Sequence, residues 1–465
     1  MTRAADSGDA VRASSLYRAV WRWHFVAGLL VLPVLVLLAV TGGLYLFKPE
    51  LDHLLYRPLV DVQARTAPRV SAATLVENVE RGLGGKVLQL TLSERADESV
   101  RLLVREHSGQ ALSAFADPYD GRLLGAIHYG GIMQVVRKLH SLQLFGFWAS
   151  SIVEIAAGWA IVLVGTGVFL WWPRGRGGGV LRVRGRPAQR MFWRDLHAVT
   201  GAFTAVVILF LAVTGMPWSM FWGDHVQNWV AAANLYEPPP PVKVTPGWML
   251  AMDMPGMSMP GMDMPADDVK PDRPWALEKA PVPESTLTSD TTAPDGASLD
   301  RALAQFERMG LRRPFTVTLP EGLKGAFVGD YRPDRVEDSR TIYLDQYTAK
   351  ALGDVGFPQW GVGAKAIEWG IAVHQGQEYG GVNRYVMLLG CIAIVVLAVT
   401  SVTMWWKRRP ARTLGMPPRP LDPKAERGLM TILILVGLLY PLVGLTLILA
   451  LLAEAGMQRV QAHRK

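Results

Sequence analysis

Five long runs without Asp, Glu, Lys or Arg constrain the fold of this 465-residue chain more than any other feature. Each run is close to or above the roughly 20 residues that a helix needs to cross a bilayer. They predict five transmembrane helices, whereas a soluble protein that buries five such helices is disfavoured by their length. With the flanking residues that fit each helix, the predicted spans are 23–47, 151–173, 196–222, 384–406 and 428–453. The first is longer than a signal-peptide core and lacks an A-x-A-like cleavage site, so we expect it to be retained.

Lys and Arg residues predict the orientation of these helices. The net charge is +8, and the basic residues gather in segments 1–22, 174–195 and 407–427. By the positive-inside rule these segments face the cytoplasm of a bacterial inner membrane, with a cytoplasmic N-terminus. Regions 48–150 and 223–383, and the C-terminal tail 454–465, are then expected on the periplasmic side. Short basic loops beside spans are ordinary topology signals, so we expect no nucleic-acid partner.

Equal spacings indicate an internal duplication. Seventeen positions separate His24 from Thr41, and the same number separates His197 from Thr214. The step from His140 to Thr166 is 26 positions, as is the step from His374 to Thr400. The duplication predicts two halves, each made of a span, an external module and a second span, with the fifth span outside the repeat.

The external modules are predicted to be α+β. Alternating stretches at 100–104 and 315–319 indicate strands, and helical patterns precede them near 71–82 and 298–309. The first module lies within 48–150 and the second at 298–356, after a Pro- and Met-rich linker at 236–297. The predicted fold class is therefore a membrane α-helical protein with two external α+β modules.

Three motifs give the chain a resemblance to a known family. Trp21-Arg22-Trp23-His24 opens a span that ends in Ala39-Val40-Thr41-Gly42, and Asp117–Gly125 reads D-P-Y-x-G-x-L-L-G. The chain resembles the PepSY-associated transmembrane family over most of residues 15–410. This resemblance implies an iron-regulated inner-membrane protein, and one branch of the family is similar to dihaem reductases of ferric siderophores. The second module departs from the motif, with Gln346 and Ala349 in place of Pro and Gly.

The four repeated histidines are candidate haem ligands. His24 and His197 lie at the predicted cytoplasmic face, and His140 and His374 at the external face. Two imidazoles saturate a haem iron, which then transfers electrons. The single cysteine, Cys391, excludes covalent attachment through C-x-x-C-H, so we expect two non-covalent b-type haems. The alternative is that these histidines are interfacial anchors. Basic neighbours are candidates for propionate binding, or else plain topology charges: Arg22, Arg194, Arg137 and Lys138.

The linker contains a methionine tract with a five-residue M-x-M-P-G repeat. Thioether sulfur is a soft ligand that favours Cu(I). The tract therefore predicts copper capture, although a low-complexity linker rich in Met is the alternative. Its methionines are Met252, Met254, Met257, Met259, Met262 and Met264.

Together these features predict a membrane metalloreductase of the ferric-chelate or cupric type. Electrons from a quinol or a cytoplasmic reductant would cross the bilayer and reduce a periplasmic metal chelate, a ferric siderophore or Cu(II). The alternative is a non-redox PepSY membrane protein that binds metal or regulates a periplasmic peptidase. A transport path is poorly supported, because the long apolar runs carry no charged residue and show no broken-helix pattern.

Overall fold

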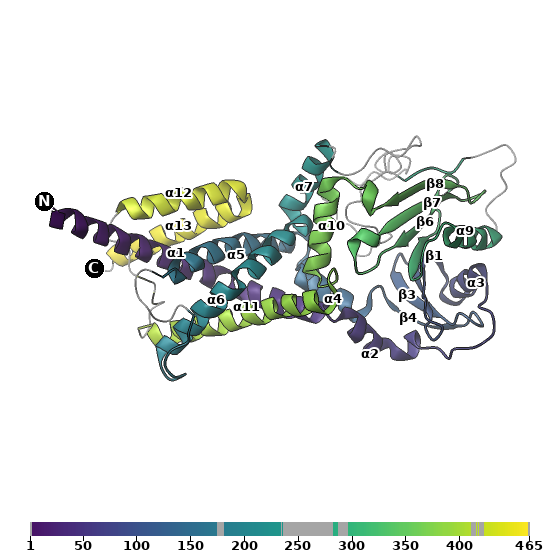
Figure 1. Ribbon diagram of the computed structural model, residues 1–465, viewed down its shortest axis with the longest axis horizontal. Coiled ribbons are helices and arrows are strands. Elements are labelled where there is room, and N and C mark those ends of the chain that lie inside the picture. The colour runs from purple at the N-terminus through teal and green to yellow at the C-terminus, as the bar shows by residue number, and fades with distance from the viewer. Residues whose placement is uncertain are drawn as a thin grey trace.

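The structure is a computed structural model that describes residues 2–173, 181–233, 235, 282–286, 296–410, 415, 417 and 423–463. The methionine tract and part of each basic loop lie outside the described residues. An elongated helical bundle and a β-sheet form the two ends of the molecule (Figure 1). Below, the end of the bundle next to the sheet is called sheet-proximal, and the opposite end sheet-distal.

Four helices of the bundle are long and apolar enough to cross a membrane. They are α1 (Thr2–Tyr45), α5 (Ser150–Trp171), α6 (Arg190–Thr214) and α11 (Gly380–Arg408). Each packs against two others, in the cyclic order α1, α5, α6, α11. Helices α1 and α6 therefore lie diagonally across the bundle. Four of the five predicted spans thus correspond to apolar helices of membrane-spanning length, and the chain is a membrane protein.

The fifth apolar run differs from the prediction. It is divided into α12 (Pro423–Leu439) and α13 (Pro441–His463), which form a hairpin around Tyr440. Pro441 cannot donate the backbone hydrogen bond that would continue α12. The two arms approach so closely that a Cβ added to Gly437 would lie 2.7 Å from Gly444 Cα.

This hairpin also changes the expected position of the C-terminus. A single fifth span would leave the tail 454–465 at the sheet-proximal end. Instead α13 runs back along α5, and the two termini lie at the same end of the molecule (Figure 1). The hairpin therefore brings the end of α13 to the sheet-distal end of the bundle, and the membrane side of the tail stays a prediction.

The two predicted modules join in one eight-stranded antiparallel sheet, with strand order β4-β3-β2-β1-β5-β6-β7-β8. The first module supplies β1 (Gly85–Leu92), β2 (Val100–Glu106), β3 (Ala111–Ala116) and β4 (Leu123–His128). The second supplies β5 (Phe315–Thr318), β6 (Ala326–Tyr331), β7 (Arg340–Asp345) and β8 (Ala351–Gly356). Pairing of β1 with β5 joins the modules, supported by a 2.9 Å hydrogen bond from Gln89 Nε2 to Thr318 Oγ1.

Two helices cover the same face of this sheet, α3 (Ala72–Leu83) and α9 (Gly296–Arg308) (Figure 1). They bury Leu75, Val79, Ala302 and Phe306 in a core shared by both modules. Burial of apolar surface stabilises the sheet by about 25 cal/mol for each Å² removed from water. The two modules therefore share their main hydrophobic core.

The modules keep the same β-turn despite the sequence departure at Ala349. Asp117 and Asp345 begin equivalent turns, and each carboxylate accepts a hydrogen bond from the backbone of the tyrosine two residues later. Gly121 has a φ of 72°, and Ala349 at the equivalent position has a φ of 54°. A left-handed conformation costs a residue with a Cβ roughly 1–2 kcal/mol. The second turn is therefore a strained copy of the first.

Short helices connect the spans to the sheet. Helix α2 (Lys48–Val60) follows α1, and η1 (Gln143–Phe145) and η2 (Phe147–Ala149) precede α5. Helix α4 (Gly131–His140) packs against α1, and α10 (Val362–His374) packs against α6. The second half also contains η3 (Met216–Trp218) and α7 (Met220–Ala232) after α6, and η6 (Val336–Asp338) and η7 (Phe357–Gln359) around β7 and β8. Because α4 and α10 end at His140 and His374, both histidines lie at the sheet-proximal end.

Candidate cofactor site

Two of the predicted histidines meet at the sheet-distal part of the bundle. His24 of α1 and His197 of α6 face each other across the bundle, with ring centroids 6.2 Å apart and ring planes at 87°. They lie 173 positions apart in the sequence. The diagonal arrangement of α1 and α6 brings them together.

A threonine on a neighbouring helix holds each of these rings. His24 Nδ1 lies 2.8 Å from Thr166 Oγ1 of α5, and His197 Nδ1 lies 3.0 Å from Thr400 Oγ1 of α11. Both threonine hydroxyls donate to the carbonyl oxygen four residues earlier in their own helix. A hydroxyl has one hydrogen, so each must accept from the imidazole. We therefore assign the proton to Nδ1, which leaves the lone pair of Nε2 available.

The sheet-proximal histidines have the same arrangement. His140 Nδ1 lies 2.8 Å from Thr41 Oγ1 of α1, and His374 Nδ1 lies 2.8 Å from Thr214 Oγ1 of α6. These two hydroxyls also donate to the carbonyl four residues earlier, which assigns the same tautomer. All four histidines thus present a neutral Nε2, the form that binds a metal.

Electrostatics at the sheet-proximal end favour that neutral form. His140 and His374 belong to α4 and α10, outside the four spans. Burial lowers the pKa of each imidazole to about 4, and the nearby His140 adds to the effect at His374. Both rings are therefore uncharged at neutral pH. The ring of Trp218 in η3 lies edge-on to His374, with centroids 6.0 Å apart, and is 45% exposed.

Glycines beside the threonines make room for the rings. A Cβ on Gly42 would lie 3.2 Å from His140 Cε1, and one on Gly167 would lie 3.3 Å from His24 Cε1. In contrast, Gly28 and Gly201 face leucine side chains of α5 and α11 and serve helix packing. Thr400, which contacts His197, is followed by Ser401, and the Ser401 hydroxyl also lies 3.3 Å from His197 Nδ1.

The candidate propionate-binding residues are close to the histidines in sequence, and the three arginines among them have other partners in the structure. Arg22 Nη1 donates to Pro417 O at 2.8 Å, and Arg194 forms an ion pair with Asp195 at 2.7 Å. Arg137 Nε donates to Gln134 Oε1 at 2.9 Å, and the neighbouring Lys138 is half-buried. Their proposed role toward a cofactor remains a prediction.

The contacts between the threonines and the histidines were not predicted from the sequence, although the spacing between these residues revealed the duplication. The signal was present, but the pairing is crossed. Thr166 holds His24 of the preceding span, whereas the threonine 17 positions after His24 holds His140. Spacing along the chain cannot show which helices become neighbours.

Two histidines outside the four pairs, His128 and His225, do not join a metal cluster in the described structure. His128 Nδ1 pairs with Gln110 Nε2, and His225 Nδ1 pairs with Phe221 O. Within the described ranges, no three His, Cys, Asp or Glu side chains gather around a common point. The prediction for the methionine tract falls outside the described residues.

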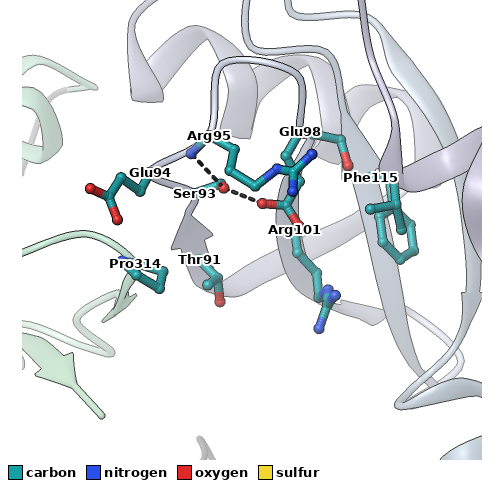
Figure 2. A pocket seen from close by; sticks show the side chains of 10 residues that line it. Thr91, Ser93, Glu94, Arg95, Glu98, Arg101, Phe115 and Pro314 are labelled. Carbon is teal, nitrogen blue, oxygen red and sulfur yellow. Dashed lines mark hydrogen bonds between the residues drawn. The ribbon is translucent and has the colours of Figure 1, made fainter. Parts of the chain in front are cut away.

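A hollow of about 310 Å³ lies on the sheet, apart from the histidines. Thr91, Arg101 and Phe115 line it from three adjacent strands, β1 to β3. At the rim of the hollow, the Ser93 hydroxyl accepts a hydrogen bond from the Arg95 backbone N–H and donates one to the Glu98 carboxylate (Figure 2). The Arg101 guanidinium lies 5.6 Å from the centre of the Phe115 ring.

Comparison with known proteins agrees with this architecture. The family model described as the PepSY-associated TM region matches residues 21–408, a range that includes all four histidines and their threonines. Among curated proteins, none matches the chain. Since the family model covers most of the sequence, the chain belongs to the PepSY-associated TM region family.

Proposed function

We propose that this protein is a dihaem b electron-transfer protein of the bacterial inner membrane that reduces an extracytoplasmic metal substrate. The observation that carries the proposal is the set of four equivalent histidine–threonine pairs. Two pairs lie at each end of the bundle, and in each the imidazole Nδ1 is held by a hydroxyl. Histidines that bind metals commonly donate their other ring N–H in this way.

The spacing of His24 and His197 fits bis-imidazole ligation. An imidazole nitrogen lies about 2 Å from a metal that it binds, so two rings on opposite sides of one ion have centres about 6 Å apart. Their observed separation is 6.2 Å. Under this proposal His24 and His197 hold one haem, and His140 and His374 hold the other. When bound, such a haem accepts and donates single electrons without an open position for other ligands.

The position of the two sites suits electron transfer across a bilayer. Seventeen residues of α1 separate His24 from Thr41, the partner of His140. At 1.5 Å per residue this is about 25 Å, most of the hydrocarbon thickness. The basic segments near the sheet-distal end support a cytoplasmic position for that end by the positive-inside rule. The sheet then lies in the periplasm, with the N-terminus in the cytoplasm.

A ferric siderophore or Cu(II) is the proposed substrate, and a quinol or a cytoplasmic reductant the donor. Thioethers of the methionine tract would hold Cu(I) after reduction. The experiment is to reduce the purified protein with dithionite and follow haem oxidation by Cu(II) and by a ferric siderophore. The control replaces the six tract methionines with Leu.

Two outcomes of this experiment each select a substrate, and a third contradicts the proposal. If the Leu replacement lowers only the rate of haem oxidation by Cu(II) or the retention of copper, copper handling is supported. Oxidation by the ferric chelate with no response to copper supports the siderophore. A reduced protein that neither substrate oxidises contradicts the reductase proposal.

The hollow on the sheet favours one alternative function. Its mixed charged and aromatic lining could bind a ligand with no redox chemistry, as expected of a PepSY protein that binds metal or regulates a peptidase. Arg101→Ala would abolish ligand capture under this alternative. The same variant leaves haem content and haem oxidation unchanged under the dihaem proposal.

A further inference from the structure

A buried carboxylate lies inside one of the spans, one position before the uncharged run that predicted this span. Glu154 is in α5, one turn from its start, and is 1% exposed. Its Oε2 accepts a hydrogen bond from the Phe221 backbone at 2.9 Å. Its Oε1 is buried and has no hydrogen-bond partner among the described residues. An unsatisfied buried polar atom costs roughly 1–3 kcal/mol, and more when charged, so its presence requires an explanation.

A buried donor without a partner lies in the same cluster. Trp222 follows Phe221 in α7, and its indole Nε1 is buried with no acceptor in the described part of the chain. The Trp222 ring lies 5.8 Å from the ring of Tyr440, at the tip of the α12–α13 hairpin. Tyr440 in turn interacts electrostatically with Glu154. Three elements far apart in sequence thus enclose one unused acceptor and one unused donor.

We propose that this cluster binds the hydroxyl-bearing head of a quinol. A quinol hydroxyl donates one hydrogen bond and accepts another, as Glu154 Oε1 and Trp222 Nε1 together require. The rings of Phe221, Trp222 and Tyr440 provide an aromatic surface for the apolar quinol ring. A quinol is also dissolved in the bilayer, and so reaches α5 from the lipid.

The inference rests on the proposed function for its electron acceptor, and it concerns the quinol donor alone. A quinol oxidised beside His374 would deliver its electrons at the sheet-proximal end, whereas electrons from a cytoplasmic reductant would cross the bilayer through both haems. Trp218, whose ring contacts His374, precedes Phe221 by three residues, so one short segment touches both the carboxylate and the histidine. Oxidation breaks two O–H bonds of the quinol and yields a quinone, two electrons and two protons. Two metal ions of the substrate take the electrons, one each. Glu154 accepts one proton and water the other, near the exposed His225.

Binding to the full-length protein tests the site without turnover. The protein is reduced with dithionite, and decylubiquinol binding is measured by equilibrium dialysis in mild detergent; decylubiquinone binding is measured separately with oxidised protein. A quinone has no hydroxyl to donate but still accepts from an indole. Glu154→Gln should therefore weaken quinol binding about tenfold and quinone binding much less. Trp222→Phe should weaken both about tenfold.

Glu378→Gln is the matched control. Glu378 is also 1% exposed, and one of its carboxylate oxygens has no hydrogen-bond partner in the described structure. Its other oxygen accepts a hydrogen bond from the Val336 backbone N–H, next to the sheet. This variant should bind both probes normally. Equal binding by all variants, or no binding by the unmodified protein, overturns the inference. Haem content of the same preparations separates the two proposals: haem without quinol binding leaves the dihaem function standing, and quinol binding without haem leaves only this site.

Discussion

His24 of α1 and Thr166 of α5 are joined by a 2.8 Å contact between Nδ1 and Oγ1, although 142 positions separate them. The threonine hydrogen is already donated to the Val162 carbonyl, so the histidine must be the donor. The contact therefore fixes both the ring orientation and the position of the ring proton. The same relationship at His197, His140 and His374 makes it the repeated element of the bundle.

Removing a threonine hydroxyl should weaken cofactor binding without removing the ligand. Thr166→Val keeps the shape of the side chain but leaves Nδ1 of His24 without its acceptor. Loss of such a supporting hydrogen bond typically costs 10–100-fold in metal affinity. We expect the variant to lose haem from one of its two sites on dilution. Absorbance measures this haem release in the presence of a haem-free protein that captures the released haem.

Thr204→Val is the matched control for this measurement. Thr204 also lies in a span, α6, and its hydroxyl donates to the Thr200 carbonyl. Unlike Thr166, it bonds no histidine in the described structure. Its haem release should equal that of the unmodified protein. If both valine variants release haem at the same rate, the threonines have no role in holding the imidazoles.

The C-terminus should lie on the same side of the membrane as the basic loops. A reporter fused after His463, Arg184 or Arg412 should give a cytoplasmic signal, and one after Asp268 a periplasmic signal. The hairpin around Tyr440 is the reason for the first expectation, and the positive-inside rule for the others. A periplasmic signal at His463 alone would mean that the fifth run crosses the membrane once.

Ala349→Gly should stabilise the second module. The φ of 54° is unfavourable for alanine, and glycine relieves this strain at some cost in unfolded-state entropy. We expect a net gain of about 1 kcal/mol, or a roughly fivefold slowing of amide exchange in β7 and β8 of the full-length protein. Gly121→Ala should act in the opposite direction in β3 and β4, since its Cβ would also lie 2.8 Å from Asn78 Nδ2. Unchanged exchange in both variants would show that neither turn limits local stability.

Residue patterns within one segment were sufficient to predict much of the fold. The uncharged runs located four spans, and alternation at 100–104 and 315–319 located strands that became β2 and β5. Equal spacings identified the histidines that the structure brings into pairs. Each of these signals depends on neighbours along the chain, where periodicity reflects burial.

Features that depend on distant segments could not be predicted in the same way. Pro441 interrupts an otherwise apolar run, and only the packing of α12 against α13 makes it a hairpin corner. Glu154 lies one position before a run defined by the absence of charge, so its burial in α5 was not foreseen. The joining of β1 to β5 requires pairing across more than 220 positions, which no local pattern encodes.

The haem content of the purified protein tests the central claim most directly. The full-length chain, produced in haem-replete cells and purified in mild detergent, should contain about two non-covalent b-type haems with low-spin absorbance spectra. His24→Ala or His197→Ala should remove the sheet-distal haem, and His140→Ala or His374→Ala the other, leaving one haem per chain in each case. His53→Ala, at an exposed histidine that pairs with Asp61, should retain both. A colourless unmodified protein, or full haem content in all four ligand variants, would contradict the account.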